Sequence, residues 1–154
     1  MVFAQAVKAQ KPRLQSAKIT AWIYAGVLTV MALAQLFAFE KLVPLFQGMA
    51  FPGGEGTGSL LICLIVFYEV FSVPFLLRMP LSPLMRWVSM VFSLLGPLMW
   101  LGVALWTMND STVTNAGILG TKVAISPGLQ VVAALVLLVF AALSARGLWP
   151  SLKK

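Results

Sequence analysis

Apolar residues fill four long stretches of the chain, and charged or turn-forming residues separate them. The stretches cover residues 19–39, 60–77, 87–106 and 127–145. A helix rises about 1.5 Å per residue and the hydrocarbon core of a bilayer is about 30 Å thick, so about 20 apolar residues span it. The pattern predicts an all-α integral membrane protein, a four-transmembrane-helix bundle formed by residues 1–154 as one domain.

The composition agrees with this pattern, and the placement of the basic residues decides how the net positive charge is interpreted. The 154 residues are 60% hydrophobic and 10% charged, whereas a soluble domain carries about 25% charged residues. A formal net charge of +7 would suggest nucleic-acid binding if the basic residues formed a patch on a soluble face. Here they lie between apolar stretches instead. We therefore expect the protein to contact the lipid bilayer and no nucleic acid.

Lysine and arginine are distributed unequally between the connections, which predicts the orientation of the bundle. Most of the basic residues fall on one side: Lys8, Lys11, Arg13, Lys18, Arg78, Arg86, Arg146, Lys153 and Lys154. The other side receives Lys41 and Lys122, together with Glu40, Glu55 and Asp110. Because the side rich in lysine and arginine usually faces the cytoplasm, we expect both termini to be cytoplasmic (N-in, C-in). A bacterial inner (plasma) membrane is the expected location.

Glu69 is the one charged residue of the second apolar stretch and lies near its middle. An ionisable side chain at that depth costs on the order of 2.5 kcal/mol, which marks it as a candidate functional residue. Tyr68 precedes it, and Ser72 follows three residues later on the same helical face. A protonated Glu69 that donates to a kink-freed carbonyl or a serine hydroxyl would specify the fold. Proton transfer, or contact with a quinone or a lipid, is the functional interpretation.

Two connections on the non-cytoplasmic side carry most of the remaining polar sequence. Residues 43–59 are rich in glycine but match no phosphate-binding motif, so we expect a flexible connection. In residues 108–125, threonine and valine surround an Asn/Gly turn, which predicts a short β-hairpin over the bundle. Such a cap would offer polar side chains to a partner, and the candidate contacts are Asp110, Thr112, Thr114 and Asn115.

Residue types that many enzymes need are missing from the sequence. Histidine is absent, and Cys63 is the single cysteine. These counts exclude a bis-histidine haem, a histidine metal site, a Ser-His-Asp triad and a Cys-x-x-Cys pair within the chain. We therefore expect no catalytic residues, no metal site and no cofactor bound by this chain alone. Cys63 is expected to be a small packing residue.

Short motifs in the first two stretches resemble a known family. Residues 39–44 read Phe-Glu-Lys-Leu-Val-Pro, and Glu69 lies within Tyr-Glu-Val. Together with four spans of this length, they resemble the DoxX-like/MauE-like group of small four-helix membrane proteins. The resemblance covers roughly residues 22–106. It implies an accessory or assembly role near membrane redox chemistry, with Lys41, Pro44 and Glu69 as the family-matching positions.

The sequence favours a non-catalytic accessory subunit or assembly factor of a larger membrane complex, redox- or quinone-linked as the resemblance implies. Its partners would be other membrane-protein subunits. The alternative is a small proton-coupled transporter in which Glu69 is the switchable carboxylate. A transporter needs further polar residues along a path across the membrane, and such residues are sparse in the apolar stretches.

Overall fold

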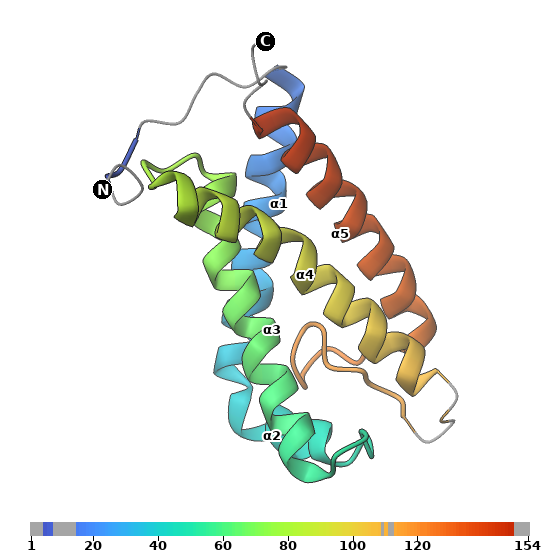
Figure 1. The fold of residues 1–154 in the computed structure, drawn as a ribbon. Coiled ribbons are helices and arrows are strands. Elements are labelled where there is room, and N and C mark those ends of the chain that lie inside the picture. The colour runs from blue at the N-terminus through green and yellow to red at the C-terminus, as the bar shows by residue number, and fades with distance from the viewer. Residues whose placement is uncertain (1–4, 8–14, 109, 111–112, 150–154) are drawn as a thin grey trace.

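Four long helices and one short helix make up most of the part of the chain that the structure describes (Figure 1). A computed structural model describes residues 5–7, 15–108, 110 and 113–149. The helices in this part of the chain are α1 (Gln15–Phe37), α2 (Phe39–Gln47), α3 (Glu55–Leu76), α4 (Pro83–Thr107) and α5 (Pro127–Leu148). Of these, α1, α3, α4 and α5 are long and apolar enough to cross a membrane. The predicted four-helix membrane bundle is confirmed.

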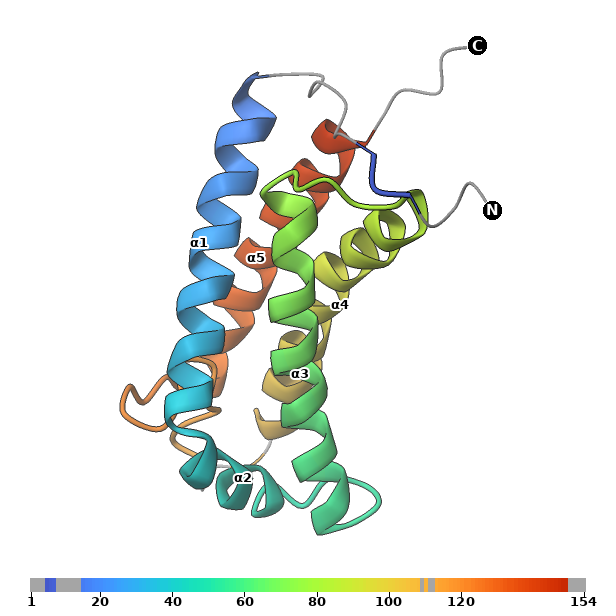
Figure 2. The ribbon, with the colours of Figure 1, turned by 90° about the vertical axis from the view of Figure 1, so that its left-hand side faces the viewer.

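The four long helices pack in a ring. In it, α3 packs against α1 and α4, and α5 packs against the same two helices from the other side (Figure 2). The start of α1, the α3–α4 connection and the end of α5 lie together at one end of the bundle. We call this the basic end, after Lys18, Arg78, Arg86 and Arg146. At the opposite end lie α2, the start of α3 and the α4–α5 connection, which carry both acidic and basic residues.

The α3–α4 connection at the basic end is a well-defined turn. Arg78 adopts a left-handed conformation (φ 59°), and the Met79 N–H donates to the Pro74 carbonyl at 2.9 Å, as in a helix-ending Schellman motif. Ser82 then caps α4 by accepting a hydrogen bond from the Met85 N–H at 3.2 Å. The N-terminal segment is joined to this turn, because the Val7 N–H donates to the Leu81 carbonyl at 3.1 Å.

Helix α2 was not predicted, and the first span does not continue to Phe39. The chain leaves α1 after Phe37, and Phe39 begins a second helix of nine residues. Leu42 and Phe46 are both fully buried, four residues apart on one face, while Lys41 is exposed. The apolar residues after Phe37 are therefore used to cover the end of the bundle rather than to lengthen the first span. A nine-residue segment containing proline is too short to be recognised as a span.

The predicted β-hairpin in the α4–α5 connection is wrong, since the described residues there contain no strand. Asn115 organises the connection instead: its Oδ1 accepts from the Gly117 N–H at 2.9 Å and its Nδ2 donates to the Gly120 carbonyl at 3.3 Å. Ala116 and Ile118 are buried. The connection therefore folds into the end of the bundle rather than over it, and side chains satisfy backbone groups that a strand ladder would have paired.

Candidate functional site

The carboxyl group of Glu69 is buried at the centre of the bundle. Glu69 lies on α3 and is 1% exposed. Its Oε1 accepts a hydrogen bond from Trp100 Nε1 of α4 at 2.7 Å and another from Gln35 Nε2 of α1 at 3.2 Å. One oxygen atom thus joins three of the four membrane-spanning helices directly.

The same hydrogen-bond network extends to the fourth helix and to the α4–α5 connection. Gln130 of α5 donates through Nε2 to the Trp100 carbonyl at 3.4 Å. Gln35 Nε2 donates to the Ile118 carbonyl at 3.1 Å as well as to Glu69. We call these five residues, Gln35, Glu69, Trp100, Ile118 and Gln130, the Glu69 network. Since it reaches every spanning helix, it fixes how the helices are placed around the core.

The hydrogen-bonding groups of the network suit a protonated Glu69. Three oxygens of the network receive no hydrogen bond within the described part of the chain: Glu69 Oε2, Gln35 Oε1 and Gln130 Oε1. The network therefore has more acceptors than donors, and a protonated carboxyl contributes one more donor. A carboxylate would instead place a negative charge in an apolar core far from the basic residues, which is costly.

A second buried contact lies where proline interrupts the backbone hydrogen bonds of α4. Pro97 has no N–H, so it cannot bond the carbonyl of Ser93 four residues before it. The hydroxyl of Tyr24, which is fully buried on α1, donates to that Ser93 carbonyl at 2.6 Å. The tyrosine replaces the missing helical donor and joins α1 to α4.

Ser89 makes a related contact beside the other proline in the spans, Pro74. The Ser89 hydroxyl on α4 accepts from the Phe75 N–H at 3.2 Å and donates to the Phe71 carbonyl. The hydroxyl thus bridges the Phe75 N–H and the Phe71 carbonyl, which are four residues apart on α3. Ser89 therefore joins α4 to α3 in the turn that contains Pro74, but the carbonyl that loses its donor at Pro74 is that of Val70, not that of Phe71.

Tyr68 and Ser72, the predicted neighbours of Glu69, do not touch its carboxyl group. Tyr68 is half-buried and its ring packs against Phe92, with centroids 5.0 Å apart. Ser72 is buried, and its hydroxyl donates to the Glu69 backbone carbonyl at 2.7 Å. The predicted partners of Glu69, a kink-freed carbonyl or a serine hydroxyl, are replaced by an indole and an amide.

The remaining predicted positions lie at the end of the bundle opposite the basic end. Lys41 and Pro44 are on α2, where Lys41 is exposed. Thr114 is exposed, Asn115 is used inside the connection, and Thr112 lies outside the described residues. Asp110 is exposed and lines a pocket of about 220 Å³ with Met49, Trp106 and others. None of the described residues among them belongs to the Glu69 network.

The sequence alone does not mark Trp100 as a site residue, because tryptophan in a membrane span is most often found near the membrane faces. Trp100 is fully buried and meets the ring of Phe46 edge-on at 6.1 Å. Buried residues on α4 also include Ser89, Ser93, Gly96, Pro97 and Thr107. Their recurrence every three to four residues is the signal for one inward-facing helix surface. Cys63, expected to be packed, is exposed.

We expect Tyr24→Phe to lower the free energy of unfolding by about 1 kcal/mol, because the Ser93 carbonyl loses its donor. In a Pro97→Ala background the same substitution should cost less, since an alanine at this position restores a backbone N–H for that carbonyl. Unfolding in mixed detergent micelles measures the cost of Tyr24→Phe in the wild-type and in the Pro97→Ala background. Tyr68→Phe is the matched control, and an equal cost in both backgrounds would contradict the assignment.

The described residues contain no cluster of three or more histidine, cysteine, aspartate or glutamate side chains that could hold a metal ion. The buried carboxyl group of Glu69 can form hydrogen bonds and exchange a proton. Comparison with protein-family models, with curated proteins and with solved structures found no match.

Proposed function

We propose that this protein is a non-catalytic accessory subunit or assembly factor of a larger membrane complex. The observation that carries the proposal is the enclosure of Glu69, which is 1% exposed and held by Trp100 and Gln35. A carboxyl group enclosed in this way joins helices and does not meet a substrate. The outer surface is then the part of the molecule that can act on other molecules.

That outer surface is apolar along the length of the spanning helices. On α5, for example, the exposed side chains are Leu129, Val132, Leu135, Val136, Val139 and Leu143. Such a surface can pack against lipid or against the helices of other subunits. The resemblance to DoxX-like/MauE-like proteins favours a redox- or quinone-linked complex as the partner. At the end opposite the basic end, Asp110 and Thr114 offer polar contacts next to this surface.

Purification in a mild detergent from native membranes, followed by mass spectrometry, tests the proposal. We expect stoichiometric co-purification of larger membrane subunits. The control is an unrelated four-helix membrane protein that carries the same tag in the same cells. A chain that emerges alone or as a homo-oligomer would contradict the accessory role. Proton-flux assays on Glu69→Gln would then test the transporter alternative.

We propose further that the basic end faces the cytoplasm of a bacterial cell, because lysine and arginine concentrate there. In a Cys63→Ser background, Met79→Cys probes the basic end and Lys122→Cys probes the opposite end; both native side chains are exposed. A membrane-impermeant maleimide should label the cysteine at 122 in intact cells, and the cysteine at 79 only after permeabilisation. The reverse pattern would overturn the orientation.

A further inference from the structure

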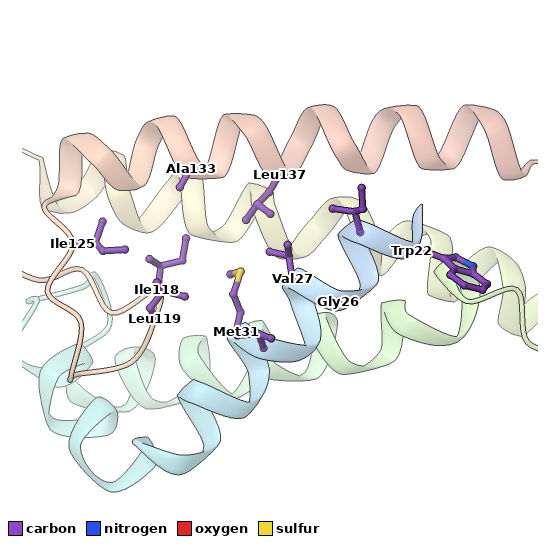
Figure 3. A pocket seen from close by; sticks show the side chains of 11 residues that line it. Trp22, Gly26, Val27, Met31, Ile118, Leu119, Ile125, Ala133 and Leu137 are labelled. Carbon is purple, nitrogen blue, oxygen red and sulfur yellow. The ribbon is translucent and has the colours of Figure 1, made fainter. Parts of the chain in front are cut away.

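An elongated groove lies on the bundle surface between α1 and α5 (Figure 3). It encloses about 530 Å³. Its lining is almost entirely hydrocarbon and includes Trp22, Gly26 and Met31 of α1, Leu137 of α5, and Ile118 and Ile125 of the α4–α5 connection. Figure 3 shows Trp22 at one extremity and Ile125 at the other. The groove thus begins toward the basic end and is closed by the connection at the opposite end.

The positively charged side chain of Lys18 lies one helical turn beyond the Trp22 extremity of the groove. Lys18 Nζ lies 5.0 Å from the centroid of the Trp22 ring. The chain has four acidic residues: Glu69 is in the core, and Glu40, Glu55 and Asp110 belong to α2, the start of α3 and the segment after α4. The basic end therefore has no aspartate or glutamate to neutralise Lys18. An anion from outside the chain fits this position.

We propose that the groove binds one acyl chain of an anionic phospholipid whose phosphate contacts Lys18. Tryptophan and lysine are the side chains that proteins place at the level of lipid headgroups. Anionic lipids attract basic residues at the cytoplasmic membrane surface, and the groove opens toward the basic end. The acyl chain then follows the apolar lining of the groove toward the bilayer centre. This binding site is independent of the proposed accessory role.

The length and the apolar lining of the groove suit an acyl chain. From Trp22 to Met31 the groove follows α1 for about 14 Å, at about 1.5 Å per residue. A quinone ring would need hydrogen-bond donors, and the Trp22 indole is the only side-chain donor in the lining.

Gly26 provides a way to block the groove without disturbing the bundle. A Cβ atom built at Gly26 meets no atom of the described chain within 4 Å, and the same holds at Gly102 of α4. Gly26→Trp should therefore fill the groove, whereas Gly102→Trp adds the same bulk outside it. Lys18→Gln removes the proposed phosphate contact, and Lys122→Gln removes a charge at the opposite end as its control.

Native mass spectrometry of the detergent-purified protein, supplied with equal amounts of phosphatidylglycerol and phosphatidylcholine of identical acyl chains, tests the proposal. We expect one retained phosphatidylglycerol on the wild type and on both controls. Gly26→Trp should lose it, and Lys18→Gln should lower the preference for it about fivefold.

Equal retention of the two lipids would overturn the proposal. So would phosphatidylglycerol that persists on Gly26→Trp, or a preference that Lys18→Gln leaves unchanged. A quinone or a peptide that occupies the groove and is displaced by Gly26→Trp would also overturn it, because the occupant would then differ from an anionic lipid.

Discussion

Glu69→Leu should lower the free energy of unfolding by about 2–6 kcal/mol, because two buried N–H groups lose their acceptor at about 1–3 kcal/mol each. These are the Trp100 Nε1–H and one of the two Gln35 Nε2–H groups; the other Gln35 N–H still donates to the Ile118 carbonyl. Glu69→Gln should cost less than about 1 kcal/mol, since an amide, like a protonated carboxyl group, offers one acceptor and a donor. The difference between the two variants isolates the hydrogen bonds from the loss of the ionisable group.

Equilibrium unfolding in mixed micelles, followed by circular dichroism, measures these changes. Glu40→Leu is a suitable control, because Glu40 is exposed on α2. In a double-mutant cycle, Trp100→Phe should cost less when Glu69 is already leucine, since both changes remove the same 2.7 Å hydrogen bond. A Glu69→Gln variant that fails to fold would contradict the protonated network and indicate an ionised carboxylate.

The spans and the central depth of Glu69 could be predicted from the sequence, because both follow from the length and polarity of a single segment. Apolar length identifies a span without any knowledge of its neighbours. Distance from the ends of that span then places residue 69 near mid-membrane. The four long helices follow the predicted stretches, with boundaries that differ by a few residues. Polar residues such as Gln15 and Ser16 extend a helix beyond its apolar part, where hydropathy no longer marks the boundary.

The partners of Glu69 could not be predicted, because they depend on how distant helices are rotated about their axes. Trp100 is 31 residues away in sequence and Gln35 is 34 residues away. Tryptophan is common at both membrane faces, so its position in the span suggested a belt residue. The α4–α5 connection was misread for a similar reason. Threonine, valine and an Asn/Gly turn are typical of a hairpin, but the burial of Ile118 depends on the space that the bundle leaves at its end.

Gly58→Ala should destabilise the protein by about 2–3 kcal/mol, the range of an overpacked core position. A Cβ atom at residue 58 would lie 2.5 Å from the backbone oxygen of Phe46 and 2.7 Å from its carbonyl carbon. These atoms belong to the backbone of α2, so no side chain can rotate away to make room. The substitution must move α2 away from α3.

Gly56→Ala is the matched control, two residues earlier on the same helix. A Cβ atom there meets nothing within 4 Å, so alanine should be neutral or stabilise the helix by up to about 1 kcal/mol. The comparison in mixed micelles cancels the general effect of replacing glycine. Similar unfolding free energies for the two variants would contradict the close α2–α3 packing.

The displacement of α2 should also weaken the Glu69 network. Phe46 packs edge-on against Trp100, and the two ring centroids are 6.1 Å apart. When Gly58→Ala moves Phe46, the indole that donates to Glu69 loses its packing support. Combining Gly58→Ala with Glu69→Leu should therefore cost less than the sum of the two single changes. Strict additivity would mean that α2 covers the end of the bundle without holding Trp100 in place.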